Sequence, residues 1–174
     1  CDEASKYGVV EITNYNCPMQ LVIAGEQQAV TEAGRLALVY GAKRCVPLKV
    51  SGPFHTSLLE PAARALHEEF RHIRFAKPKF PVIFNATARP LASGETVRGL
   101  LELQVHHSVL FEDSVRYMAA QGIDTVVEIG PGKALSGFIK KTTKAIKTYN
   151  IEDCAGLEKT LSLLKEQVRE EATA

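Results

Sequence analysis

The sequence predicts an α/β protein, in which a mostly parallel sheet flanked by helices follows a smaller α+β segment. Beyond about residue 50, short β-rich runs alternate with stretches whose apolar residues recur at helical spacing, an order typical of parallel sheets. Before that point two β-rich runs, one helix and a further extended run follow one another. This β-β-α-β order resembles most of a small split α+β module that lacks its first strand and helix.

Four elements are predicted in the first part of the chain. They are strands at Val9–Asn14 and Met19–Ala24, a helix at Glu26–Tyr40 and an extended run at Ala42–Val50. The turn-prone stretch 14–18 separates the two strands, and Gly41 follows the helix as a stop signal. Pro47 indicates that the last run is an edge strand or is irregular.

Eight elements are predicted in the second part. They are a helix at Leu58–Ile73, a short buried strand at Pro81–Asn85, helices at Glu95–Val105 and Phe111–Gln121, a strand at Thr125–Ile129, a helix from Lys133 to about Thr142, a strand at Thr148–Ile151 and a helix at Gly156–Glu170. The first helix carries one apolar stripe. Ser57 and Glu60 are spaced as a capping box at its start.

Composition excludes several classes of protein. With 21 Lys and Arg against 20 Asp and Glu in 174 residues, the net charge of +1 provides no field that would attract nucleic acid or an anionic membrane. The apolar runs are too short to span a bilayer, and no signal peptide precedes them. The 4 cysteines form no C-x-x-C pair, so we expect reduced thiols in a cytoplasmic protein.

His55 is the candidate catalytic residue. It lies between a Gly-Pro-Phe turn and the capped start of a helix, and the positive end of a helix disfavours an imidazolium ion. A neutral histidine there could accept a proton as a general base. From these features alone, a loop histidine that only packs or forms hydrogen bonds remains the slightly better interpretation.

Other motifs favour structural interpretations. The loop from Gly130 to Lys133 lacks the spacing of a P-loop or a dinucleotide-binding motif, so a turn is favoured over an anion site. No G-x-S-x-G nucleophile motif is present, and Cys17 has no charged neighbour in sequence that would activate it. Neither the adjacent pair His106 and His107 nor any carboxylate has metal-ligand spacing, so we predict no metal.

Four motifs in order carry a resemblance to a known family. They are Asn14-x-Asn16-x-Pro18-x-Gln20 continuing to Gly25, Val50-Ser51-Gly52-Pro53-Phe54-His55-Thr56-Ser57, Gln104-Val105 followed by Val109-x-Phe111, and Glu128-Ile129-Gly130-Pro131-Gly132-Lys133-x-Leu135-Ser136-Gly137. Together they resemble the C-terminal part of the malonyl-CoA:acyl carrier protein transacylases of type II fatty acid synthesis. Acyltransferase domains of polyketide and animal fatty acid synthases belong to the same family.

The resemblance implies a large α/β hydrolase-like subdomain with an inserted ferredoxin-like subdomain. Residues 1–48 would form most of the small subdomain, and residues 49–174 the C-terminal part of the large one. It also implies a ping-pong transfer of malonyl from malonyl-CoA, through a serine ester, to acyl carrier protein, with no cofactor.

The resemblance also assigns roles to residues of the site. His55 matches the catalytic base, and Gln104 matches the residue whose backbone carbonyl fixes the imidazole. Further positions match the acyl site. They are the polar residues Asn16 and Gln20 and the apolar residues Val50 and Phe54. The Phe54 ring, just before the histidine, leaves little room for an α-methyl group, so the resemblance implies that the site takes malonyl.

The chain departs from the family pattern in ways that affect activity. The nucleophile motif G-H-S-x-G, the oxyanion loop and the arginine that pairs with malonyl are all missing. Ser108 replaces a usual proline and Phe111 a usual tryptophan, with only local effects on packing. We therefore expect a piece of a larger protein that is inactive without its N-terminal part. The alternatives are a non-catalytic module that binds carrier protein and a polyketide-type acyltransferase with another acyl specificity.

Overall fold

The computed structural model describes residues 1–50 and 52–173, apart from the side chains of residues 167, 168 and 170–173. It has helices and two small sheets, which confirms the predicted α/β class. The chain forms two compact units, residues 1–114 and 115–174, and passes from one to the other within helix α4 (Phe111–Ala120). Among the described residues, no helix is both long and apolar enough to cross a bilayer.

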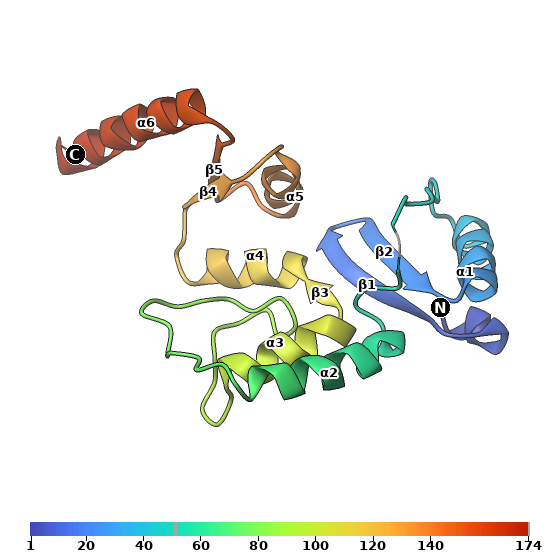
Figure 1. Cartoon of the computed structure of the whole chain (residues 1–174). Helices are drawn as coiled ribbons and strands as arrows, with labels where there is room; N and C mark the ends of the chain where they lie inside the picture. Colours follow the sequence, from blue (N-terminus) through green and yellow to red (C-terminus); the bar gives the residue numbers. More distant parts are fainter. Residues whose placement is uncertain (51, 174) are drawn as a thin grey trace. The chain divides into compact units, whose positions relative to one another are not determined.

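The first unit contains a three-stranded sheet with the order β2-β1-β3 (Figure 1). Strands β1 (Val10–Cys17) and β2 (Gln20–Gly25) pair in antiparallel fashion, whereas β3 (Val109–Leu110) pairs with β1 in parallel. β1 is therefore the central strand, with hydrogen-bonded neighbours on both sides.

Small side chains form the core beside this sheet. The core consists of Ala4 from the 3-10 helix η1 (Asp2–Tyr7), Val10, and Ala29 and Ala33 from helix α1 (Gln27–Val39). The three alanines let the two helices approach the sheet closely, because each contributes only a methyl group to the core. The predicted helix at residues 26–40 is thus confirmed.

The turn predicted at residues 14–18 is wrong, because β1 continues to Cys17. Pairing of Tyr15 with Leu21 and of Cys17 with Gln20 extends the hairpin, so that only two residues close it. Two register shifts interrupt the pairing, one between Ile12 and Asn14 and one between Tyr15 and Cys17. Ladder hydrogen bonds override the local turn preference, and the irregularities absorb the resulting mismatch.

The extended run predicted at residues 42–50 is irregular, one of the two forms that Pro47 indicated, and the strand predicted at residues 81–85 does not form. Residues 42–50 contain no strand, and residues 81–85 contribute only an isolated bridge in which the Phe84 amide donates to the Arg89 carbonyl at 3.1 Å. The Pro81–Asn85 segment is also less buried than predicted, since Val82 is 37% exposed. A strand exists only where a partner offers its backbone groups, and no second strand of the described residues lies along either segment.

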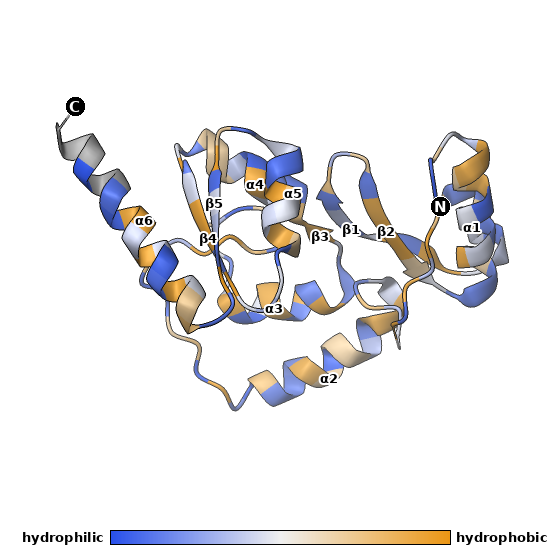
Figure 2. Cartoon of the chain, turned by 90° about the horizontal axis from the view of Figure 1, so that it is seen from above, coloured by the Kyte–Doolittle hydropathy of each residue, from blue (hydrophilic) through white to orange (hydrophobic). Residues whose placement is uncertain are grey.

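Helices α2 (Glu60–Phe70) and α3 (Val97–His106) pack side by side (Figure 1). Both are amphipathic, with polar and apolar residues alternating along them (Figure 2). A short 3-10 turn, η2 (Ser57–Leu59), precedes α2, so the predicted capping box is wrong. Leu59 takes the N-cap position of α2 without a side-chain bond, whereas Thr96 caps α3 by accepting from the Gly99 amide at 3.0 Å.

The second unit is a β-α-β arrangement followed by a long helix. Strands β4 (Thr125–Ile129) and β5 (Lys147–Ile151) pair in parallel, with helix α5 (Ala134–Thr142) between them in sequence and α6 (Cys154–Thr173) after them. The predicted order of elements is confirmed here. This local motif is readable from the sequence because its strands and helix follow one another directly.

The glycine loop before α5 is a structural turn, as predicted. The Glu128 carboxylate accepts hydrogen bonds from the amides of Leu135 and Ser136 at 3.1 and 2.8 Å, and the Glu152 carboxylate accepts from the Gly132 amide at 3.1 Å. The free amides at the N-terminus of a helix attract anions. Here carboxylates of the chain itself already fill that role.

A salt bridge stabilises the loop before α3. The two guanidinium nitrogens of Arg89 donate to Glu95 at 2.9 and 2.7 Å, and the Ala92 amide donates to the same carboxylate at 2.8 Å. The bond from Arg89, followed by that from Ala92, lowers the pKa of Glu95 from 4.5 to about 2. The charged carboxylate therefore favours the folded loop.

The first prediction concerns the hairpin turn. Met19 has φ 66° and is 97% exposed, and it follows Pro18 in the position of a type II turn that favours glycine. Met19→Gly should raise the free energy of unfolding by about 0.5–1 kcal/mol, because relief of the left-handed strain exceeds the entropy cost of glycine. Urea denaturation measures the change, and Met19→Ala is the control that keeps the Cβ. An equal gain for alanine would contradict the strain explanation.

The second prediction concerns pH. Because the pKa of Glu95 is lowered in the folded state to about 2, its contribution to stability should be complete above pH 4.5 and disappear as the pH falls towards 2. Glu95→Gln should therefore destabilise the chain at pH 7 and make progressively less difference below pH 4.5. Urea denaturation across this range tests it. Glu68→Gln, which removes a more exposed pair with Arg71, should have a smaller effect. A Glu95→Gln effect of equal size at pH 7 and pH 2.5 would contradict the prediction.

Candidate active site

His55 occupies a strained position in the loop before η2. Its φ of 65° lies in the left-handed region, which costs a non-glycine residue roughly 1–3 kcal/mol unless the surroundings impose it. The surroundings do so here, since the His55 amide donates to the Val105 carbonyl at 3.2 Å. The neighbouring Thr56 is fully buried, and its hydroxyl donates to the Pro53 carbonyl at 2.7 Å. The loop is thus held from both sides of the histidine.

The imidazole of His55 contacts the backbone of Gln104. Its Nδ1 lies 2.8 Å from the Gln104 carbonyl oxygen, which can only accept, so Nδ1 carries the proton and donates. The opposite tautomer would place two acceptors at this distance. Nε2 is then the nitrogen with a free lone pair. A half-buried imidazole fixed in this tautomer can accept a proton at Nε2.

The amide side chain of Gln104 has a different role from its carbonyl. Its Nε2 lies 3.2 Å from Nδ1 of His55 and also 3.2 Å from the His107 carbonyl oxygen. An amide nitrogen only donates, and a protonated Nδ1 cannot accept. The Gln104 side chain therefore donates to the His107 carbonyl, and its proximity to Nδ1 of His55 is a packing contact. The backbone carbonyl of Gln104 therefore fixes the tautomer.

His55 also caps the C-terminus of helix α3. The carbonyls of Gln104 and Val105 belong to the last turn of this helix, whose carbonyl groups have no partner inside the helix. The ring and the amide of His55 each donate to one of them. The end of a helix carries partial negative charge, which stabilises a positive imidazole once it has taken a proton.

The polar residues of the expected acyl site lie at the closed end of the hairpin. Asn16 falls within the register shift between Tyr15 and Cys17, where no residue of β2 is paired with it. Gln20 begins β2, and its Oε1 lies 3.8 Å from the sulfur of Cys17, which is fully buried. Irregularities of this kind redirect a side chain near active sites.

The two apolar residues of the expected site are exposed. Val50 and Phe54 are 65% and 53% exposed, and the Phe54 ring lies beside Gly52. Ser51, which belongs to the same motif, lies outside the described residues. Residues that form the wall of an apolar binding site are normally packed against other side chains, whereas these two are largely open to solvent. The roles predicted for Val50 and Phe54 therefore stay predictions.

Two residues outside the predicted site, Glu11 and Ile12, are bonded to the segments that carry His55 and Gln104. The Glu11 carboxylate accepts from the Ser57 amide at 2.9 Å and from the Ser57 hydroxyl, and the Ser108 hydroxyl donates to the Ile12 carbonyl at 2.6 Å. These bonds join residues 46 and 96 positions apart. No motif connects residues at such separations, so only the folded chain reveals them.

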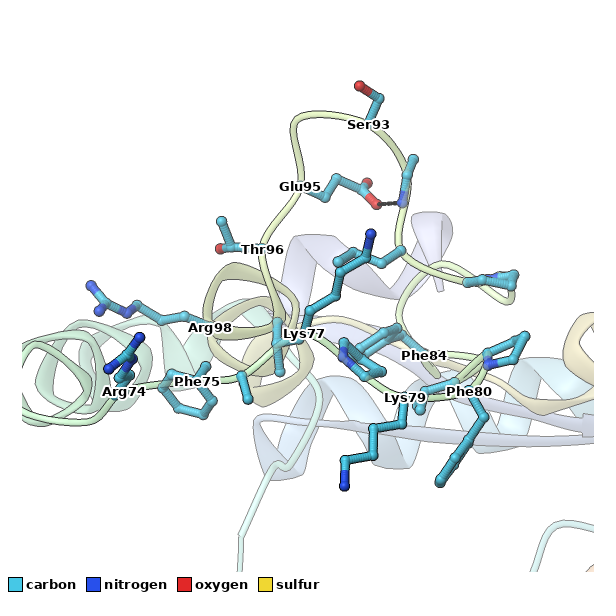
Figure 3. A pocket seen from close by; sticks show the side chains of 18 of the residues that line it. Arg74, Phe75, Lys77, Lys79, Phe80, Phe84, Ser93, Glu95, Thr96 and Arg98 are labelled. Atoms are coloured by element: carbon cyan, nitrogen blue, oxygen red, sulfur yellow. Dashed lines mark hydrogen bonds between the residues drawn. The ribbon is translucent and has the colours of Figure 1, made fainter.

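A separate groove lies between the end of α2 and the start of α3. It has a volume of about 1120 Å³ and is lined by residues of segment 73–98, and His55 is not among them. Figure 3 shows aromatic and basic side chains around it, with Glu95 at its edge. The labelled residues of these two kinds are Phe75, Phe80 and Phe84, and Arg74, Lys77, Lys79 and Arg98. The groove is therefore lined by both aromatic and cationic side chains.

The remaining histidines do not form a metal site. His106 and His107 lie edge to face with ring centroids 4.5 Å apart, and Nδ1 of His67 lies 3.0 Å from the Glu102 carboxylate. Among the described residues, no three histidine, cysteine or acidic side chains are grouped as metal ligands. His67 is half-exposed, and its contact with Glu102 joins α2 to α3.

Known proteins share both the sequence and the fold of this chain. No family model matches it. A curated relative from Bacillus subtilis, a malonyl CoA-acyl carrier protein transacylase, is 39% identical over 167 residues, which are 95% of this chain and 53% of the relative. The chain thus spans about half the length of the curated relatives it matches.

Solved structures agree with this similarity. The malonyl CoA-acyl carrier protein transacylase of Clostridium perfringens is 43% identical, with a TM-score of 0.92 over 98% of this chain and 54% of that one. A malonyl-transacylase solved in complex with a type II polyketide synthase acyl-carrier protein is 36% identical, with a TM-score of 0.89 over 93% of this chain and 52% of that one. Over nearly all of its residues, therefore, the chain is a homologue of the malonyl CoA-acyl carrier protein transacylases and corresponds to about half of their length.

Proposed function

We propose that this chain supplies the general base of an enzyme that transfers malonyl groups from malonyl-CoA to acyl carrier protein in fatty acid synthesis. The observation that supports it most directly is the 2.8 Å bond between Nδ1 of His55 and the Gln104 carbonyl. This bond leaves Nε2 free to take a proton, as a base that activates a nucleophile must. The homology to proteins named for this transfer supports the choice of substrates.

The proposed reaction has two half-reactions at His55. In the first, Nε2 takes the proton of a serine hydroxyl from the rest of the protein, and the serine oxygen attacks the thioester carbonyl of malonyl-CoA. The carbon–sulfur bond breaks, and the CoA sulfur leaves with the proton from the imidazolium. In the second, Nε2 takes the proton of the carrier's pantetheine thiol, and the thiol sulfur attacks the ester carbonyl. The bond between the acyl carbon and the serine oxygen breaks, and this oxygen takes the proton back from the imidazolium. No cofactor is needed, because the acyl group arrives as an activated thioester.

The Gln104 carbonyl takes the part that a carboxylate plays in a serine-histidine-aspartate triad. It holds the ring in the productive tautomer and faces the positive charge that forms on the imidazole. A single carbonyl is a weaker partner for a cation than a carboxylate. Its place in the last turn of α3 adds the partial negative charge of the helix end.

We also propose the finer organisation that the family implies. Residues 1–48 would belong to a ferredoxin-like subdomain and residues 49–174 to a hydrolase-like one, with Asn16, Gln20, Val50 and Phe54 around the acyl group. The exposed apolar groups of Phe54 and of the groove at residues 73–98 support a second polypeptide segment that covers them. That segment would carry the serine and the oxyanion donors. A cytoplasmic location stays a prediction.

The third prediction tests the activity. The chain alone should not transfer malonyl, whereas the chain combined with the N-terminal half of the Bacillus subtilis relative should do so. In that mixture His55→Ala should lower the rate at least about 100-fold, the usual range for loss of a general base. Transfer of labelled malonyl to acyl carrier protein is the measurement. His72→Ala, at an exposed histidine after α2, is the control and should keep the rate.

Two other outcomes would replace this proposal. Binding of acyl carrier protein without turnover, in the chain and in the mixture, would indicate a non-catalytic carrier-binding module. Faster transfer of another acyl-CoA than of malonyl-CoA would indicate a polyketide-type acyltransferase with a different specificity.

The fourth prediction concerns acyl specificity. Phe54→Ser should raise the use of methylmalonyl-CoA relative to malonyl-CoA by about tenfold, because the smaller side chain leaves room for an α-methyl group. The ratio of kcat/KM for the two substrates in the combined enzyme measures this. Phe80→Ser is the matched control, since Phe80 is a similarly exposed phenylalanine that lines the separate groove. An unchanged ratio in Phe54→Ser would contradict the assignment of Phe54 to the acyl site.

A further inference from the structure

We propose that Glu11 is a positioning residue for His55. The inference rests on the base role proposed above and names the group that holds the base in place. Glu11 is in β1, the central strand of the first unit's sheet. Both of its carboxylate oxygens accept from Ser57, one from the amide at 2.9 Å and one from the hydroxyl. Ser57 follows His55 by two residues, so the carboxylate is bonded to the segment that carries the imidazole.

β1 is also bonded to the segment that carries Gln104, the partner of the His55 imidazole. Ile12, the next residue of β1, accepts from the Ser108 hydroxyl at 2.6 Å. Ser108 follows Gln104 by four residues and immediately precedes β3, which pairs with β1. Two consecutive residues of one strand are thus bonded to the two segments whose contact fixes the tautomer of His55. β1 therefore sets the distance between His55 and Gln104.

The Glu11 carboxylate accepts from the first amide of η2, which has no capping side chain from the residue before it. The 3-10 turn η2 begins at Ser57, and Thr56, which is in the N-cap position, makes no side-chain bond to the turn. The Thr56 hydroxyl donates instead to Pro53. The free amide of Ser57 therefore receives its acceptor from a different strand. A carboxylate at a helix start is favourable both as an acceptor and as a charge.

The bond between Glu11 and Ser57 matters for the imidazole because the His55 backbone is strained. The left-handed backbone of His55 is sustained only while neighbouring residues are held, and Ser57 is the nearest one bonded to another element through its side chain. Loss of the carboxylate lets the loop relax away from φ 65°. The imidazole then moves away from the Gln104 carbonyl, and a shift of more than about half an ångström takes the 2.8 Å hydrogen bond beyond the usual range of about 2.7–3.2 Å.

The experiment compares two carboxylates that both accept a backbone amide in the first unit. Glu11 accepts from Ser57, and Glu26 accepts from the Val9 amide at 2.7 Å, in a part of the unit without contact to His55. Two-dimensional ¹H–¹⁵N NMR of the full chain reports which nitrogen of His55 carries the proton. The wild type and Glu26→Gln should show the proton on Nδ1. Glu11→Ala should show a mixture of tautomers, and Glu11→Gln, which keeps one acceptor oxygen, a smaller change in the same direction.

A kinetic measurement adds a second readout. In the chain combined with the N-terminal half of the Bacillus subtilis relative, Glu11→Ala should lower kcat by about 10- to 100-fold with little change in the KM for malonyl-CoA, since a misplaced base affects the chemical step. If Glu11→Ala leaves the tautomer of His55 as in Glu26→Gln, the inference is overturned and Glu11 only stabilises the fold. A tautomer change together with absent transfer in the wild-type mixture would support the positioning role and count against the proposed function.

Discussion

The hydrogen bond from His55 to the carbonyl of Gln104 is the interaction on which the candidate site depends. It selects one imidazole tautomer, and it satisfies a carbonyl that helix α3 leaves without a partner at its end. A neutral acceptor suffices because the helix end contributes partial negative charge. The bond therefore serves two purposes at once: it completes the helix terminus, and it makes one ring nitrogen available as a base.

Strand β1 brings the parts of this site together. It is central in its sheet, its far end closes the hairpin that carries Asn16 and Gln20, and its middle residues accept hydrogen bonds from the loops on either side of the imidazole contact. One of its two register shifts lies near the middle of the strand and the other next to the turn. A strand interrupted in this way can present side chains that regular alternation would direct elsewhere.

The sequence predictions succeed where a structure depends on residues close in sequence, and they fail where it depends on distant residues. The β-α-β unit after residue 124 forms as predicted, because its pairing and packing involve neighbours in sequence. The strand predicted at 81–85 does not form, because β-rich residues form a strand only beside a partner. The capping box fails for a related reason, since Ser57 is bonded to Glu11 on another strand instead of to its own helix.

The sequence by itself determined the α/β class, most of the helices, the structural nature of the glycine loop and, through resemblance, the identity of His55 and Gln104 as a pair. These features depend on residue type and on short spacings, which a linear chain already contains. Only the tertiary structure decided the tautomer of the imidazole, the left-handed backbone that aims it, and the anchoring carboxylate of Glu11. Each of these depends on groups brought together from 46 or more positions apart, and the free energy of such contacts exists only in the folded chain.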